Sequence, residues 1–287
     1  MAESETPDPF AAAATAVREH DRDRYVADFF IGERSRRYVL ALHAFNAEVA
    51  RVRDVVSEPA VGEIRLQWWR EALAGNDGGH PVARAVRQTI AGFNLPMEPF
   101  RRLLEARTFD LYDDPMPTLN DLEGYVGETS SALIQMAAIV LAGGRDPGTA
   151  EAAGHGGVAY AITGLLRSLP IHARRGQQYL PRDVMAVHGA DAAEMFAGRT
   201  SEALRAVLGD LRARARDHLA KAQQALAGAP SEVKPAFVPL GLVEPYLARM
   251  EWPGYDPLRT LVSLPAWGRP WLLWRASRRL QVSGRRG

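Results

Sequence analysis

Hydrophobic residues recur along this chain at steps of three and four, which is the spacing of one face of an α-helix. Within residues 35–55, for example, Val39, Leu42 and Phe45 follow this rule. No segment shows the alternation of apolar and polar residues that is typical of a half-buried strand. The pattern therefore predicts an all-α fold.

The same periodicity and the breaks between periodic stretches set the expected helix boundaries. Glycine- and proline-rich turns separate the segments, as at residues 75–79 and 252–254. Because we find no internal repeat and no long linker, we expect one helical domain over residues 11–260, after a flexible tail over 1–10 and before a Trp/Arg-rich helix and basic tail over 261–287. The predicted helices cover residues 11–20, 35–55, 62–73, 81–92, 97–111, 118–142, 148–174, 201–227, 231–250 and 267–282.

Composition narrows the class of protein. With 287 residues, 47% hydrophobic and 24% charged, the chain can bury a sizeable core. Its net charge of +1 gives no field that would recruit nucleic acid, and the absence of cysteine excludes disulfides and thiolate chemistry. The acidic N-terminus lacks a secretory signal, and the apolar stretch 132–142 is shorter than the roughly 20 residues that span a bilayer. We expect a soluble, cytoplasmic protein.

Several motifs resemble the squalene/phytoene synthase family. The most specific is Arg174-Arg175-Gly176 followed by Tyr179-Leu180-Pro181, which is similar to the second aspartate-rich motif of that family. Residues 41–46 resemble the stretch before the first such motif, and residues 122–128 resemble the helix that lines the active cavity. The resemblance covers about residues 20–250. It implies an isoprenoid-synthase fold, a helical bundle around a central cavity.

The family's paired aspartates are mostly missing from this chain. In the enzymes, two pairs of aspartates four residues apart hold magnesium and diphosphate. By the resemblance, the first pair falls on Ala50 and Asp54 and the second on Ser168 and His172. Magnesium is usually held by carboxylates and substrate phosphates. We therefore expect no cofactor, with magnesium only in an active enzyme and Asp54 as its one weak ligand candidate; the alternative is an ion pair of Asp54 with Arg51 or a neighbouring helix.

Arginines are expected to cluster near the places that metals would occupy. Their guanidinium groups can donate paired hydrogen bonds to phosphate but cannot replace a bridging metal. His172 is either a phosphate donor or a histidine tucked away in a former active site, and Pro170 predicts a kink in the second motif. The alternative for residues 174–176 is a solvated helix end. The candidate ligand- or phosphate-binding residues are Arg51, Arg167, Arg174, Arg175 and Tyr179, with Arg53 nearby.

The resemblance is stronger to an aspartate-poor subgroup of the family, on residues 57–71 and 265–275. That subgroup includes an assembly factor of respiratory complex I and related bacterial proteins. It implies a pseudoenzyme that acts in complex I assembly or binds an isoprenoid or lipid. The alternative is an active prenyltransferase that condenses two prenyl diphosphates head to head.

The C-terminal segment offers a second functional clue. Trp267, Trp271 and Trp274 fall on one face of a predicted helix, a pattern that suits a membrane interface with anionic lipids. This predicts a peripheral contact with the inner face of the membrane; the alternative is a helix that docks its tryptophans on the protein body. The surrounding arginines are Arg269, Arg275, Arg278, Arg279, Arg285 and Arg286.

Two other features have structural interpretations. Residues 154–157, Gly-His-Gly-Gly, lack the spacing and the lysine of a phosphate-binding loop, so they predict either a helix entry or a close helix crossing. Trp68 and Trp69 lie in an amphipathic stretch, and we interpret them as core or partner-facing anchors.

Overall fold

The computed structural model describes residues 8–282, and among these residues it contains helices and no strand. The predicted all-α fold is therefore confirmed. The α-helices are α1 (Pro9–His20), α2 (Arg22–Ala27), α3 (Glu33–Ala50), α4 (Pro59–Ala74), α5 (Pro81–Phe93), α6 (Glu98–Ala106), α7 (Leu119–Val126), α8 (Ala132–Leu141), α9 (Ala150–Arg167), α10 (Leu169–Arg174), α11 (Arg182–His188), α12 (Ala192–Phe196), α13 (Glu202–Ala225), α14 (Val243–Arg249) and α15 (Gly268–Val282).

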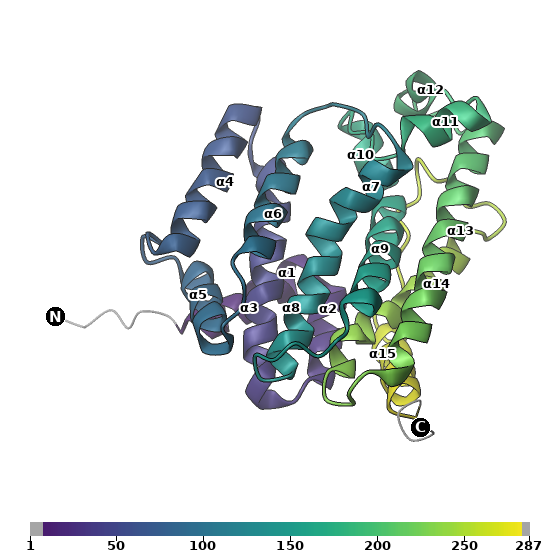
Figure 1. The fold of residues 1–287 in the computed structure, drawn as a ribbon. Coiled ribbons are helices and arrows are strands. Elements are labelled where there is room, and N and C mark those ends of the chain that lie inside the picture. Colours follow the sequence, from purple (N-terminus) through teal and green to yellow (C-terminus); the bar gives the residue numbers. More distant parts are fainter. Residues whose placement is uncertain (1–7, 283–287) are drawn as a thin grey trace.

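The long helices stand roughly upright, side by side, in Figure 1. Helices α9 and α13 pack against each other, and α3 packs against α1 and α8. Helix α4 stands at one outer edge, while α15 lies at the lower end of the bundle. The apolar face predicted for residues 35–55 is buried, since Val39, Leu42 and Phe45 are inaccessible to solvent. Burial of these faces is the main term that stabilises the bundle.

Prolines explain where the helices differ from their predicted extents. The predicted helix over 148–174 is divided at Ser168, because Pro170 begins a new helix, α10, after α9 has ended at Arg167. The predicted helix over 231–250 begins as a 3₁₀ segment, Lys234–Leu242, which contains Pro235 and Pro239.

Other helices differ from the prediction because they are short or because a 3₁₀ turn replaces their last turn. Helix α3 ends at Ala50 and a 3₁₀ turn, Val52–Val55, follows it. Helix α1 begins at Pro9 rather than at residue 11, with Asp8 as its N-cap; the rest of the predicted tail, residues 1–7, lies outside the described residues. The sequence did not predict α2, α11 and α12, which have five to seven residues and too few turns to show a period.

The glycine-rich stretch of α9 lies at a helix crossing, as predicted. A π-helical turn, Gly127–Ser131, joins α7 to α8 and packs against α9. A Cβ atom on Gly157 would come far closer to the backbone of Ser131 than the 3.0 Å that real Cβ atoms keep. The Ser131 hydroxyl also donates a hydrogen bond to the carbonyl oxygen of Gly154, at 2.8 Å. Only glycine allows this close approach.

Candidate functional site

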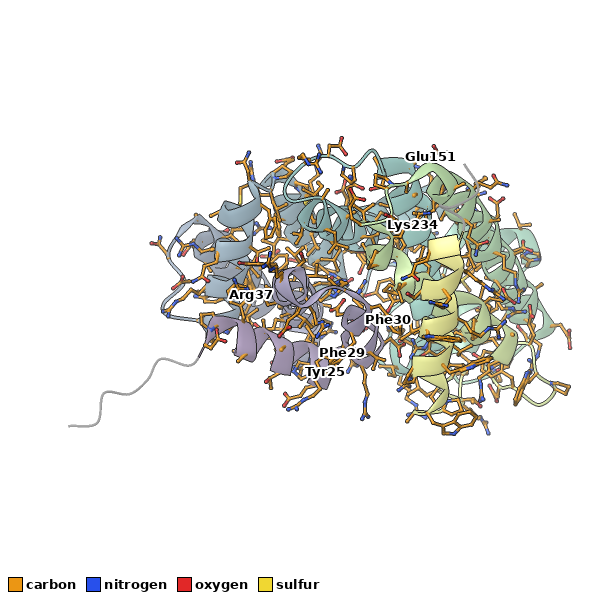
Figure 2. All side chains as sticks on the ribbon, turned by 90° about the horizontal axis from the view of Figure 1, so that it is seen from below. Tyr25, Phe29, Phe30, Arg37, Glu151 and Lys234 are labelled. Carbon is orange, nitrogen blue, oxygen red and sulfur yellow. The ribbon has the colours of Figure 1, made fainter. Side chains whose placement is uncertain are left out.

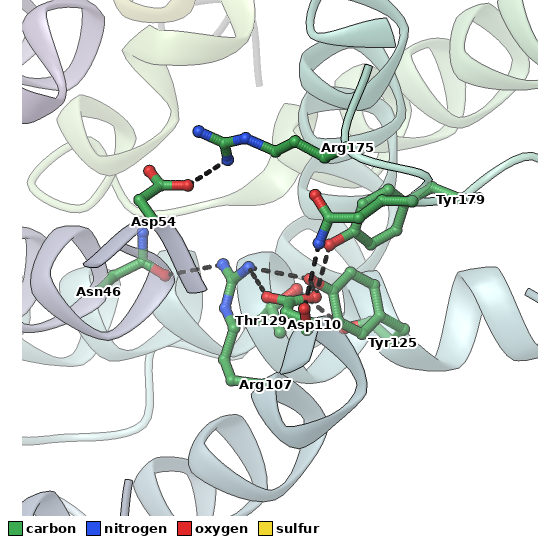
Figure 3. A network of polar contacts seen from close by, with 9 residues as sticks. Asn46, Asp54, Arg107, Asp110, Tyr125, Thr129, Arg175 and Tyr179 are labelled. Atoms are coloured by element: carbon green, nitrogen blue, oxygen red, sulfur yellow. Dashed lines mark hydrogen bonds and ion pairs between the residues drawn. The ribbon is translucent and has the colours of Figure 1, made fainter. Parts of the chain in front are cut away.

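The first motif is divided between a helix end and a turn. Ala50 is the last residue of α3, and Asp54 lies in the 3₁₀ turn that follows. The Asp54 carboxylate forms an ion pair with Arg175, which follows α10 (Figure 3). The predicted ion pair of Asp54 is therefore present, but its partner is Arg175 and not Arg51. This pair joins the two segments that carry the family's metal-binding motifs.

The second motif is broken as the proline predicted. Ser168 is at once the C-cap of α9 and the N-cap of α10, and its carbonyl oxygen accepts a hydrogen bond from the His172 amide at 3.0 Å. The imidazole of His172 packs against Tyr179, with ring centroids 4.7 Å apart. Burial lowers the pKa of His172 to about 4. The ring is therefore neutral near pH 7 and brings no positive charge to a phosphate.

A buried carboxylate, Asp110, organises the polar centre of the site (Figure 3). It accepts hydrogen bonds from Tyr125 at 2.7 Å and Tyr179 at 2.8 Å, and from Arg107 at 2.9 Å. Arg107 also donates to the Tyr125 hydroxyl at 2.8 Å and to Asn46 at 3.4 Å. Tyr179, a candidate ligand-binding residue, thus holds a structural carboxylate.

The electrostatics of this network keep its members in their ordinary charge states. Burial, together with the neighbouring Asp110 carboxylate, raises the pKa of the Tyr179 hydroxyl far above its usual value. Burial alone would lower the pKa of Arg107, but the Tyr125 hydroxyl and Asp110 outweigh it and raise that pKa. Arg107 and Asp110 form a buried ion pair at 2.9 Å, in which the Nε atom of Arg107 has no hydrogen-bond partner.

Little space remains where His172 and Tyr179 face the helices. The cavity that they line has a volume of about 10 Å³. Such a volume holds at most about one water molecule. Aliphatic side chains from α7, α9, α10 and α13 fill the surrounding space: Leu122, Ile162, Leu165, Leu166, Leu169 and Leu211. In this conformation a prenyl chain cannot enter here.

The structure divides the predicted arginine cluster. Arg175 binds Asp54, whereas Arg167 donates to Asp23 at 2.9 Å and lies 3.6 Å above the ring centroid of Tyr246. Arg167 and Ser168 line a separate polar cleft of about 400 Å³. The arginines therefore do not form a single cluster as expected, because Arg175 and Arg167 bind different carboxylates in different parts of the bundle. Of the others, Arg51 contacts His20, Arg53 lies 3.5 Å from Asp113, and Arg174 is exposed.

The residues at the motif positions do not fit a magnesium site. The side chain of Ala50 has no ligand atom, and His172, which packs on Tyr179, has only ring nitrogens, whereas magnesium prefers oxygen ligands. Ser168 offers one neutral hydroxyl group. The one carboxylate, on Asp54, is engaged by a cation. In the part of the chain that the structure describes, no three histidine, cysteine, aspartate or glutamate residues are grouped so that they could hold a metal ion.

Sequence reasoning missed Asp110 and Asp23, the two carboxylates around which the polar contacts gather. Asp23 is buried and accepts from Tyr246 at 2.6 Å, and it lies 3.0 Å from Arg269. Asp23 lies in the segment Asp23-Arg24-Tyr25, which resembles the opening of the family, but the sequence analysis did not predict it as a site residue. Asp110 belongs to no recognisable motif, and its only sequence signal was its spacing of three residues from Arg107, beside the apolar residues Phe109 and Leu111.

Trp271 and Trp274 in α15, and Trp267 directly before this helix, are exposed to solvent. The exposed fractions are 82% for Trp267, 53% for Trp271 and 51% for Trp274, while Leu273 on the opposite face is fully buried. Arg275 lies over the ring of Trp271, 4.6 Å from its centroid. The alternative interpretation, in which these tryptophans dock on the protein body, is therefore wrong. Two of the flanking arginines, Arg285 and Arg286, lie outside the described residues.

These features define a helical bundle of the isoprenoid-synthase type in which the metal-binding positions are altered. The chain belongs to the squalene/phytoene synthase family, whose model matches residues 17–279. A squalene synthase structure from Alicyclobacillus acidocaldarius superposes with a TM-score of 0.74 at 22% identity, covering 84% of this chain and 92% of that one. That likeness supports the fold.

Two curated relatives illustrate the kinds of protein that this chain is similar to. Assembly factor 6 of NADH dehydrogenase (ubiquinone) complex I from Rattus norvegicus is 31% identical over 254 residues, covering 87% of this chain and 76% of that protein. The 15-cis-phytoene synthase of Synechococcus elongatus is 26% identical, covering 85% of this chain and 86% of its own length. The chain is thus similar both to an assembly factor and to an enzyme.

The structure also bears on membrane spanning. Within residues 8–282, no helix combines the length and the apolar character needed to cross a bilayer.

Proposed function

We propose that this protein is a non-catalytic member of its family that acts in the assembly of respiratory complex I. The observation that carries the proposal is the ion pair between Asp54 and Arg175, at the place where the enzymes of the family hold magnesium and diphosphate. The similarity to complex I assembly factor 6 supports the same role. The small interior volume beside His172 and Tyr179 argues against the prenyltransferase alternative.

Deletion of the gene from its host should lower the NADH dehydrogenase activity of isolated membranes. Complementation with Asp54→Asn should restore that activity to within about twofold of wild type, because a partly exposed ion pair contributes only about 0–1 kcal/mol. The measurement is NADH oxidation by membranes, with immunoblots for equal amounts of the two forms. A folded Asp54→Asn protein that fails to complement would indicate that Asp54 has a chemical role.

The enzymatic alternative has its own assay. An active prenyltransferase would release pyrophosphate from farnesyl or geranylgeranyl diphosphate when magnesium is present. We expect no release above a protein-free control. Magnesium-dependent turnover that Asp54→Asn abolishes would contradict the proposal.

We further propose that the protein works as a peripheral protein on the membrane, with the outward face of α15 in contact with lipid. In Figure 2, which views the bundle from below, α15 is seen along its length on the near surface. Its exposed face therefore points away from the protein body. Trp267, Trp271 and Trp274 supply amphipathic rings of the kind that settle at a membrane interface. Exposed arginines at 275, 278 and 279 match an anionic headgroup.

A triple variant with serine at positions 267, 271 and 274 should bind vesicles at least about tenfold more weakly than the wild type. The reason is that the variant lacks the three indole rings whose transfer from water into the membrane interface favours binding. The measurement is co-sedimentation with vesicles of phosphatidylcholine, with and without phosphatidylglycerol. Trp252→Ser is the matched control, because Trp252 is 60% exposed but lies neither in α15 nor next to its first residue. Equal binding by the wild type and the triple variant would reject the membrane contact.

A further inference from the structure

A further pocket lies between the end of α3 and the edge helix α4, and Asp110 does not line it. It has a volume of about 460 Å³. Its walls come from the end of α3, from α4 and from the residue that precedes α5. We call it the Glu48 pocket and define it by Glu48, Arg51, Arg65, Trp68, Trp69 and His80. Of the candidate site residues, only Arg51 contributes to it.

An aromatic wall forms one side of the Glu48 pocket. Trp68 and Trp69 meet edge to face, with centroids 5.1 Å apart, and His80 packs on them at 5.2 and 5.7 Å. Trp69 is buried and also packs on Phe45, so it fixes the wall to the core. Trp68 is only half-buried. Its indole therefore offers a flat surface on which a ring or an apolar chain can lie.

Two guanidinium groups give the Glu48 pocket its positive charge. Arg51 is the C-cap of α3, and its guanidinium group contacts the Nε2 atom of His20 at the end of α1. Arg65 projects from the middle of α4 and is exposed. Arginine is suited to anions because its planar fork can donate two parallel hydrogen bonds to a carboxylate or a phosphate.

Glu48 and His80 lie next to each other in the pocket, and their protonation states determine how much of its positive charge remains. The Nδ1 atom of His80 accepts a hydrogen bond from the Ala83 amide at 3.4 Å, so the proton of the neutral ring lies on Nε2. That atom points to the Glu48 carboxyl group, 3.6 Å away. Burial lowers the pKa of His80 and raises the pKa of Glu48 to about 7, although Arg51 opposes the second shift. These shifts favour the neutral His80 ring near pH 7, and the Glu48 carboxyl group keeps its proton to a higher pH than an ordinary glutamate does.

We propose that the Glu48 pocket binds a small organic anion, with its carboxylate or phosphate on Arg51 and Arg65 and its body against Trp68. The volume suits a molecule of modest size, and the pocket joins an apolar wall to a few convergent polar groups, as ligand sites do. This inference is independent of the assembly role proposed above, since no residue of the Asp54–Arg175 pair lines the pocket.

The protonation of Glu48 makes the affinity depend on pH. The charged and titratable groups around it are Arg51 at the end of its own helix, His20 from α1, Arg65 from α4 and His80 before α5. When Glu48 loses its proton, its negative charge opposes the incoming anion. Affinity should therefore rise as the pH falls from 8 to 6, and the bound anion should in turn raise the pKa of Glu48.

The experiment is a titration of the full-length protein with phenyl phosphate, benzoate and inorganic phosphate, followed by calorimetry and tryptophan fluorescence. We expect saturable binding of phenyl phosphate, benzoate or both, tighter than that of inorganic phosphate, because the ring packs on Trp68. The preference between the first two identifies the natural ligand as a phosphate or a carboxylate. Binding of benzoate, which is fully ionised at both pH values, should be several-fold tighter at pH 6 than at pH 8, whereas phenyl phosphate itself gains negative charge over this range.

Three variants test the assignment. Arg65→Gln should weaken binding about tenfold or more, whereas Arg70→Gln on the same helix, outside the pocket, should bind like the wild type. Glu48→Gln should bind benzoate with little dependence on pH between 6 and 8. Melting curves check that each variant is folded. Absence of saturable binding by every probe at pH 6, or equal affinity in the wild type and Arg65→Gln, would overturn the proposal.

Discussion

Replacing Gly157 by alanine should destabilise the protein by about 3 kcal/mol or more, because the new methyl group has no space. Its Cβ would collide with backbone atoms of Ser131, which cannot rotate away as a side chain can. Helix α9 would have to move from the π-helical turn Gly127–Ser131, and the contact between α9 and α8 would loosen with it. The measurement is the free energy of unfolding from denaturant titration followed by circular dichroism.

Gly154→Ala is the matched control for this substitution. Gly154 lies in the same helix, three residues earlier, and a Cβ there would have no other atom within 4 Å. Alanine favours the helix over glycine by about 1 kcal/mol, so this variant should be as stable as the wild type or slightly more stable. If both variants lost the same stability, the tight crossing at Gly157 would not be the cause.

Replacing Asp110 by asparagine should lower the free energy of unfolding by about 3–5 kcal/mol, because Arg107 would keep its charge in the interior without a carboxylate. The hydroxyl groups of Tyr125 and Tyr179 would also lose a charged acceptor. For a protein of this size, such a loss lowers the melting temperature by on the order of 10 °C. Calorimetry or thermal circular dichroism can measure it.

Asp113→Asn provides the comparison for Asp110→Asn. Asp113 is only three residues further along the chain, but its side chain is exposed and lies 3.5 Å from Arg53. Its replacement should change stability by less than about 1 kcal/mol. An Asp110→Asn protein that is as stable as Asp113→Asn would show that the buried pair of Arg107 and Asp110 does not stabilise the fold.

The helices could be predicted because their signals are local. Residues 35–50 show their apolar period directly, and Pro170 marks the break between α9 and α10 in the sequence itself. The partner of Asp54 could not be predicted in the same way. Arg175 is 121 residues away, and only the packing of α10 against the rest of the bundle brings the two side chains together.

The polar centre of the site was predicted least well. Asp110 has no motif, because a buried carboxylate that accepts hydrogen bonds from two tyrosines and an arginine needs no fixed spacing among them. The orientation of α15 was likewise open, since three tryptophans at helical spacing suit either a core or an exposed face. The packing of Leu273 into the core settled which face points outward.

The ion pair of Asp54 and Arg175 determines which solution conditions can separate the two motif segments. In an enzyme that needs a metal and a charged substrate to draw two segments together, removal of either would let them part. Here two side chains of the chain itself, 38% and 43% exposed, hold the two segments together by direct contact. Concentrated salt, which screens solvent-exposed charges, is the condition that would loosen it.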